Sequence, residues 1–306
     1  MSTTTTTATA ATNTNTTIAA GTTAKDSKYV PRGPTSAELT FYAPPADNST
    51  PFNYVESPPP GQPSHNYGEN TQRVFLTDIR GNEHIFNLDK DSFQALQDVP
   101  SATTYSTFDS DASIRQIYYP EVESLLRQHL PDAHKIILFD HTIRRADPNS
   151  PRQPVNRVHV DQTPKAALAR VHLHITDPAE AKALSEGRYR IVNVWRPLST
   201  DEPVQSSPLA FASATSVDPA DLVAIEHRYP DRTGETMGVQ YNPRQRWYYW
   251  SGMTGTERLL LKCSDSRGLK DGDVAQWVPH TAFSDARTPE GARPRESIEV
   301  RALIFG

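Results

Sequence analysis

The sequence predicts a mainly β fold with flanking helices, a double-stranded β-helix of the jelly-roll or cupin-like type. After Gly187 the chain consists of short runs rich in β-branched and aromatic residues, separated by turn residues. Before Gly187 it carries helical segments, and the strand–helix–strand alternation of a parallel, Rossmann-type sheet is not apparent. Many short strands behind a helical front section favour a jelly roll with helices packed on one face.

The first 68 residues are expected to precede the domain as two segments. Residues 2–24 are mostly Thr and Ala, so they cannot bury enough apolar surface to offset their ordering entropy, and we expect 1–24 to be a disordered Thr-rich tail. Residues 25–68 are rich in Pro, Ser and Asn, which predicts an extended, loop-like arm on the domain surface rather than a separate domain. The jelly-roll domain then spans 69–306.

Between this arm and Gly187 we expect helices alternating with a few strands. Segment 72–89 is typical of two strands around a turn at Gly81-Asn82, and 135–145 of a buried strand ending in polar residues. Short amphipathic helices are expected over SFQALQD (92–98) and PEVESLLRQHL (120–130). A further helix is expected over 177–187, with Asp177 as its cap, Pro178 in its first turn and Gly187 at its end.

The strands expected after Gly187 share β-branched and aromatic residues bounded by turn signals. They are RYRIVNVWRPL (188–198), ETMGVQYN (235–242), RWYYWS (246–251), TERLLLKCSD (256–265) and ESIEVRALIFG (296–306).

Composition excludes several classes of function. The net charge is −5 and no basic run stands out, so nucleic-acid binding is not expected. No apolar stretch is long enough to span a membrane, and the N-terminus lacks the features of a secretory signal. Cys263 is the only cysteine, which fits a cytoplasmic protein and leaves His, Asp and Glu as metal ligands. On base rates we expect a homodimer.

His159 and Asp161 form an H-x-D pair in the segment HVDQTP. Successive side chains of a strand point to opposite faces, so these two point the same way, with Val160 on the other face. An imidazole and a carboxylate on one face suit Fe(II), Mn(II) or Zn(II). A polar pair at the surface is the alternative, because such tripeptides arise often by chance.

The C-terminal segment supplies the parts that this pair lacks. His280 lies in the apolar stretch WVPHTAF, and Arg295 and Ser297 begin the last strand fifteen residues later. Because side chains alternate between the two faces of a strand, the Arg295 guanidinium and the Ser297 hydroxyl point to the same face. Both groups can donate hydrogen bonds to a carboxylate there. Two imidazoles and one carboxylate form the facial triad that leaves open positions on Fe(II).

Other residues are weaker candidates for the same roles. His227 competes with His280, with Arg232 or Arg244 as anchors, but neither arginine begins an R-x-S on a clear strand. Arg301 shares the predicted face of Arg295 and is the alternative anchor. The pair His172 and His174 is expected to be structural or at the surface, and Cys263 to be a buried strand residue. His141 is a minor candidate near the site, and the aromatic run 246–251 is more typical of core than of a pocket wall.

Five linked motifs resemble a fungal hydroxylase/desaturase family of secondary metabolism, within the Fe(II)/2-oxoglutarate-dependent oxygenases. They are VHVDQTP, RYRIVNVWRPL, LKCSDS, VPHTAF and RESIEVRALIFG, and the resemblance covers roughly residues 70–306. The family includes enzymes of aspergillic acid clusters and gibberellin desaturase-like proteins. One departure from the wider superfamily is the long gap from Asp161 to His280, which an insertion around 198–235 would explain, as a lid or as a dimer contact.

The resemblance implies His159, Asp161 and His280 as iron ligands, with Arg295 and Ser297 as the anchor for the distal carboxylate of 2-oxoglutarate. Asn193 is a candidate for binding 2-oxoglutarate or substrate. Trp195, on the same face of that strand, is expected to pack in the core. The resemblance also implies O₂ as co-substrate, a small-molecule substrate and oxidation of a C–H bond of that molecule by hydroxylation, desaturation or cyclisation. Two alternatives stay open: a Zn(II) hydrolase with the same ligands, and a non-catalytic jelly-roll binding module.

Overall fold

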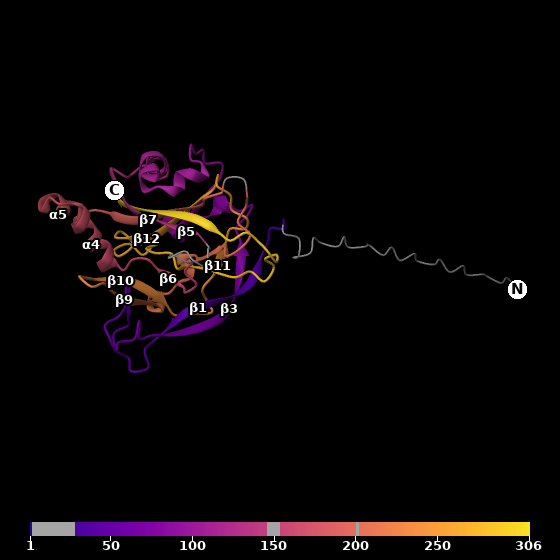
Figure 1. Ribbon diagram of the computed structural model, residues 1–306, viewed down its shortest axis with the longest axis horizontal. Helices are drawn as coiled ribbons and strands as arrows, with labels where there is room; N and C mark the ends of the chain where they lie inside the picture. Colours follow the sequence, from indigo (N-terminus) through magenta and orange to yellow (C-terminus); the bar gives the residue numbers. More distant parts are fainter. Residues whose placement is uncertain (2–27, 146–153, 200–201) are drawn as a thin grey trace.

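Two β-sheets face each other in a computed structural model that describes residue 1 and residues 28–145, 154–199 and 202–306. The chain thus has the predicted jelly-roll fold (Figure 1). The larger sheet has nine described strands, in the order β1 (Thr35–Ala43), β3 (Gly68–Asp78), β11 (Trp247–Tyr249), β8 (Leu209–Ala212), β13 (His280–Ala282), β6 (His159–Val160), β10 (Thr233–Val239), β9 (Leu222–Arg228) and β2 (Phe52–Tyr54). The smaller has five described strands, β4 (Phe93–Leu96), β12 (Arg258–Asp265), β7 (Tyr189–Pro197), β14 (Glu296–Phe305) and β5 (Lys135–Arg145).

The larger sheet curls on itself. Its first strand, β1, also meets the segment before β6, where Thr40 bridges Arg157 and the Val158 N–H donates to the Thr40 carbonyl at 2.8 Å. Gly238 on β10 permits this close approach, since a Cβ there would lie 2.7 Å from Ile225 and 2.9 Å from Tyr42. The curl encloses one apolar core, and a second core of large side chains fills the space between the two sheets.

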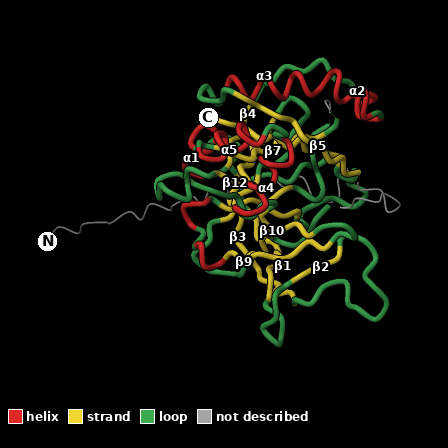
Figure 2. Tube along the Cα trace, turned by 90° about the vertical axis from the view of Figure 1, so that its left-hand side faces the viewer, coloured by secondary structure: helices red, strands yellow, loops and turns green. Residues whose placement is uncertain are grey.

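Helices cover the outer face of the smaller sheet (Figures 1 and 2). A continuous helical segment runs through α2 (Asp111–Ser113), a single π-helical stretch, η3 (Ile114–Tyr118), and α3 (Tyr119–His129). Buried residues of α3 at helical spacing, Val122, Leu125 and Leu126, pack against the even-numbered apolar residues of β14. The odd-numbered residues from Arg295, immediately before β14, to Arg301 therefore face the interior between the sheets.

The remaining helical elements are short or lie at one end of the sheets. They are α1 (Leu88–Asp91), α4 (Pro164–His174), α5 (Pro178–Glu186) and the 3₁₀ turns η1 (Glu83–Ile85), η2 (Tyr105–Asp109), η4 (Ala214–Ser216) and η5 (Pro219–Asp221). The Thr163 hydroxyl caps α4 by accepting from the Ala166 N–H at 3.0 Å, so this helix begins immediately after the H-x-D segment.

Most of the predicted elements are confirmed. Helix α3 covers the predicted 120–130, and Asp177 caps α5 by accepting from the N–H groups of Ala179 and Glu180. Strands β5, β7, β10, β11, β12 and β14 fall where the sequence predicts them. The turn after β3 has Gly81 at φ +87°, a conformation that favours glycine.

Two local predictions are wrong. The second strand of the predicted 72–89 hairpin is absent from the described structure, because Asn87 caps the short helix α1 by accepting from the Lys90 N–H at 2.9 Å. The segment SFQALQD is not a helix but contains β4, which pairs with β12 and buries Phe93 in the core between the sheets. A segment of four residues is too short for its hydrophobic periodicity to distinguish a helix from a strand. Its pairing with β12 at the edge of the smaller sheet makes it a strand.

The predicted arm 25–68 is only partly loop-like. Its residues 35–43 form β1, which pairs with β3 in continuous register and buries Leu39 and Phe41 completely or nearly so. The segment 198–235 likewise supplies β8 and β9 to the larger sheet. The predicted disordered tail, apart from Met1, lies outside the described residues. No helix in the described part of the chain is long and apolar enough to cross a membrane.

Candidate metal centre

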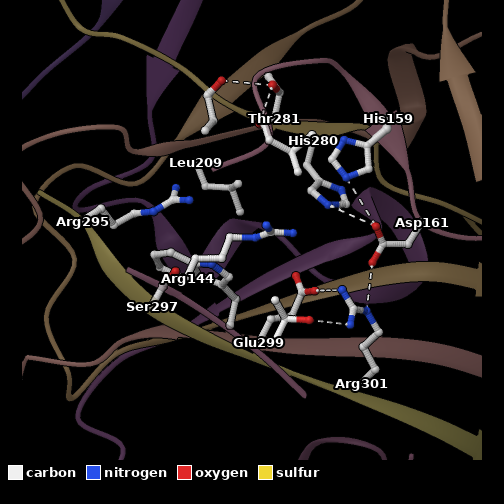
Figure 3. Close-up of a pocket in the computed structure, with 14 residues that line it drawn as sticks. Arg144, His159, Asp161, Leu209, His280, Thr281, Arg295, Ser297, Glu299 and Arg301 are labelled. Atoms are coloured by element: carbon white, nitrogen blue, oxygen red, sulfur yellow. Dashed lines mark hydrogen bonds and ion pairs between the residues drawn. The ribbon is translucent and has the colours of Figure 1, made fainter. Parts of the chain in front are cut away.

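His159, Asp161 and His280 meet between the two sheets (Figure 3). One ligand atom from each lies within 4.8 Å of the others. His159 on β6 and His280 on β13 are direct partners in the sheet register, and Asp161 follows β6. Their Nε2 atoms lie 3.4 Å (His159) and 3.9 Å (His280) from Oδ1 of Asp161. The structure therefore brings together the three residues that the sequence singled out.

Both imidazoles are oriented by the backbone. Nδ1 of His159 lies 2.8 Å from the Arg157 carbonyl, and Nδ1 of His280 lies 3.0 Å from the Val278 carbonyl. A carbonyl can only accept, so each Nδ1 donates a proton and each Nε2 keeps a lone pair directed at the cluster. Burial, and after it the nearby His159, lowers the pKa of His280 to about 4. His280 is thus held neutral, as a metal ligand must be.

The Asp161 carboxylate is held through its second oxygen. Oδ2 accepts from the Asn193 amide at 2.8 Å and from Nε of Arg301 at 3.3 Å, while Oδ1 faces the two imidazoles (Figure 3). Burial alone would raise the pKa of Asp161, but the Arg301 guanidinium, and then the imidazoles, hold it well below its usual value. The carboxylate stays ionised, with Oδ1 directed at the imidazole nitrogens.

Arg295 and Ser297 lie on the same inner wall, at the start of β14, and line a narrow cavity with the three clustered residues. Arg295 is 4% exposed, and its Nη1 donates to the Ser207 carbonyl at 2.6 Å. Its buried Nε has no hydrogen-bond partner among the described residues. Burial, and after it the neighbouring Arg144, lowers the pKa of Arg295 to about 10. A buried guanidinium with an unused donor fits an anionic group that enters the cavity.

Asn193 does not line this cavity. It is fully buried on β7 and directs its amide to Asp161, while its own Oδ1 has no partner among the described residues. The structure thus places it behind the carboxylate, not beside the Arg295 wall. Trp195, on the same face of β7, lines the cavity, and the Arg295 guanidinium lies 5.5 Å from its ring.

Three wall residues were missed by the sequence reasoning. Arg144 is the register partner of Ser297 on β5, and Figure 3 shows its guanidinium entering the space beside Arg295. Thr142 lies two residues before it. Glu299 lies between Ser297 and Arg301 on the inner face of β14, where burial raises the pKa of its carboxyl against the effect of Arg301. The period of two along ESIEVRA could have found Glu299, whereas Arg144 and Thr142 require the pairing of β5 with β14.

The alternative anchor, Arg301, is already engaged. Besides Asp161, its guanidinium binds Asp140 at 3.0 Å and Glu299 at 2.6 Å. The competing ligand His227 lies on β9 and lines a wider cavity, but does not belong to the clustered three.

The other histidines and arginines considered from the sequence lie away from the cluster. His172 is exposed on α4, and His174 stacks on Phe139. His141 bonds the Tyr119 hydroxyl. Arg232 and Arg244 are largely exposed and pair with neighbouring carboxylates.

The residues present fit a divalent metal with a bound anion. Two imidazoles and one carboxylate are a donor set that Fe(II) accepts, and all three residues line the narrow cavity. A second, wider cavity of about 750 Å³ shares His159 and Asp161 with the narrow one and is also lined by residues of β5, β9 and β10. A volume of this size can hold a drug-sized molecule.

Comparison with known proteins gives consistent matches over nearly the whole chain. A family model described as an oxidoreductase/YMDC permease-like domain matches residues 39–305. The chain is 35% identical over 303 residues to the hydroxylase/desaturase poxK of Penicillium oxalicum, covering 90% of this chain and 92% of that protein. It is 30% identical over 278 residues to the Fe(II)/2-oxoglutarate-dependent dioxygenase nvfI of Aspergillus novofumigatus, covering 88% and 96%. A solved structure of the iron and alpha-ketoglutarate-dependent endoperoxidase NvfI superposes with a TM-score of 0.79 at 28% identity, covering 90% and 99%.

Proposed function

Because the chain belongs to the hydroxylase/desaturase family that includes Fe(II)/2-oxoglutarate-dependent dioxygenases, we propose that His159, Asp161 and His280 bind Fe(II). Arg295, supported by Ser297, binds the distal carboxylate of 2-oxoglutarate. The protein is a Fe(II)/2-oxoglutarate-dependent oxygenase of secondary metabolism, with O₂ as second co-substrate. It acts on a small molecule by oxidising a C–H bond, with hydroxylation, desaturation or oxidative cyclisation as the outcome.

One observation carries the assignment of the ligands. Three residues separated by up to ~120 positions place one donor atom each within 4.8 Å, with both imidazoles in the tautomer that a metal requires. The second supporting observation is the buried Nε of Arg295, which has no protein partner among the described residues. A carboxylate would satisfy that donor.

Each group has a defined task in this site. The backbone carbonyls fix the orientation and tautomer of both imidazoles, and Arg301 keeps Asp161 ionised. Arg295 orients the co-substrate, and the buried wall around it excludes water. When bound, Fe(II) and 2-oxoglutarate supply the oxidising chemistry, in which O₂ and the oxo acid are consumed and succinate and CO₂ are released.

Anaerobic visible absorption tests this proposal. Purified protein is titrated with Fe(II) and then with 2-oxoglutarate, and a weak charge-transfer band of the chelated oxo acid is expected. His280→Ala should abolish the band. Arg295→Ala should still bind metal but need about 10- to 100-fold more 2-oxoglutarate, because it loses a charge-assisted pair.

Arg293→Ala is the matched control for Arg295. Its side chain is 49% exposed and pairs with Glu296 and Glu202 at the surface, so its loss should leave the titration unchanged. If wild-type protein binds iron but shows no band, the assignment of 2-oxoglutarate is wrong and a metal-dependent hydrolase takes its place. If no divalent metal binds, the ligand assignment itself is wrong.

A further inference from the structure

The wide cavity beside the metal cluster continues into a smaller hollow. The hollow has a volume of about 230 Å³ and lies between α4 and the β9–β10 hairpin. The two share the wall residues Asp161, Gln162, Arg170, His227 and Tyr229. A molecule that reaches the proposed iron site can therefore extend past Arg170 toward the surface. The inference that follows rests on the proposed function, because it concerns the substrate of that same site.

The wall of the wide cavity carries more positive than negative charge. It contains Arg144, Arg157, Arg170 and Arg301 but, as acids, only Asp140 and Asp161 among the described residues. Both of these acids are paired with Arg301. A metal ion would add further positive charge at His159 and Asp161. The cavity thus favours an anionic occupant over a neutral or cationic one.

Arg170 is the arginine best placed to bind such a group. It lies on α4 at the junction of the cavity and the hollow, with its guanidinium 5.0 Å from the Phe139 ring. It forms no ion pair with any acidic side chain in the described part of the chain. Arg157, another arginine in the wall of the wide cavity, does contact an acidic side chain: its guanidinium lies 3.9 Å from the Glu69 carboxylate. A guanidinium that rests on a ring and has open donors is suited to bidentate binding of an acid.

The hollow offers apolar surface beside this charge. Ala166, Ala169 and Leu173 line it at helical spacing along α4, and Tyr229, which follows β9, lines it as well. Leu173 is 62% exposed, although large aliphatic side chains are usually buried. An apolar skeleton would cover these side chains while its acidic group faces Arg170.

We propose that the substrate is an apolar small molecule with a carboxylate or another acidic group, and that Arg170 binds this group. This anion site is separate from the one proposed for 2-oxoglutarate, because Arg170 does not line the narrow cavity that contains Arg295. Arg170 then fixes which end of the substrate points at the metal. It is a specificity-determining residue and takes no part in the oxidation.

Two fluorescent probes of nearly equal shape test this proposal. One is 8-anilinonaphthalene-1-sulfonate, and the other is N-phenyl-1-naphthylamine, which lacks the acidic group. Affinities are measured on protein loaded with Mn(II) and saturated with 2-oxoglutarate, so that the Arg295 site is closed. We expect the sulfonate to bind wild-type protein at least about tenfold more tightly than the neutral probe. Arg170→Gln should remove this difference and leave the affinity of the neutral probe unchanged, and Arg170→Lys should restore part of it.

Arg244→Gln is the matched control, because Arg244 is largely exposed, pairs with Asp218 and lines neither the wide cavity nor the hollow. It should change neither affinity more than about twofold. Equal binding of both probes to wild-type protein overturns the proposal, and so does an equal loss of both in Arg170→Gln. The Fe(II)–2-oxoglutarate band is recorded on the same variants. If the band persists and the preference for the sulfonate is absent, only the substrate class is wrong. If the preference is present and the band is absent, the proposed function is wrong.

Discussion

Asn193→Val tests whether the hydrogen bond behind Asp161 supports metal binding. The Asn193 amide donates to Oδ2 of this carboxylate at 2.8 Å, and both groups lie inside the protein. A hydrogen bond to a charged group contributes about 1.5–3 kcal/mol. The bond is also present without metal, so this energy is an upper limit on the lost affinity. Removing a partner behind a metal ligand typically weakens metal binding about 10- to 100-fold, and we expect the dissociation constant to rise by that factor.

The same substitution should hardly change the free energy of unfolding of the metal-free protein. Oδ1 of Asn193 is buried without a partner among the described residues, so valine removes an uncompensated acceptor together with the donor. Valine also suits a strand whose neighbours are Val192 and Val194. The unfolding free energy should therefore stay within about 1 kcal/mol of wild type, which separates loss of metal from loss of fold.

Calorimetric titration with Mn(II) under nitrogen measures the affinity, and urea unfolding measures stability. Ser213→Ala is the control, because its hydroxyl donates to the buried Asp91 carboxylate at 2.9 Å, away from the metal cluster. This control should lose stability at unchanged Mn(II) affinity. An Asn193→Val protein whose affinity stays within twofold of wild type refutes the reasoning, since the carboxylate would then be positioned by Arg301 alone.

Three further outcomes follow from the packing and the charges. Phe41→Ala, in the segment expected to be a surface arm, should cost about 3–5 kcal/mol in urea unfolding, because the ring is fully buried in the core of the curled sheet; a cost below ~1 kcal/mol would mean that β1 is not part of the core. Burial raises the pKa of the Cys263 thiol well above its usual value, so iodoacetamide at about pH 8 should label the unfolded but not the native protein, and rapid native labelling would contradict its burial. Burial opposes ionisation of Asp132, but Arg190 and Arg188 outweigh it and hold the pKa of this carboxyl below its usual value. The ionised carboxylate therefore stabilises the fold above about pH 4, and this stabilisation is lost as the pH falls further. Asp132→Asn should therefore lower the unfolding free energy at neutral pH and less so in acid, and a deficit independent of pH would argue against this.

The site was predictable where its residues depend on local periodicity. The period of two put His159 and Asp161 on one face and Arg295 and Ser297 on another, and both pairs line the same cavity. The role of Asn193 was not predictable in this way. Its partner Asp161 lies across the space between two sheets, and no spacing along the chain reports that distance.

The fold was predictable to a similar extent. Long, strongly patterned strands such as β7 and β14 fall where expected. The proline-rich composition around β1 concealed a nine-residue strand, because burial of Leu39 and Phe41 in the curled sheet outweighs local composition. Strand β4 was mistaken for a helix for the same reason: its pairing with β12 decides its conformation.

The strands that carry the two imidazoles are only two and three residues long, and they lie ~120 positions apart in the chain. A metal bound to both would cross-link these strands and close a very long loop, much as a disulfide does. Because only the folded chain presents the three ligands together, metal at a hundredfold excess over its dissociation constant would add about 2.7 kcal/mol to the unfolding free energy. The lifetime of this enzyme in the cell should therefore follow the supply of iron, and iron starvation should reduce its abundance as well as its activity.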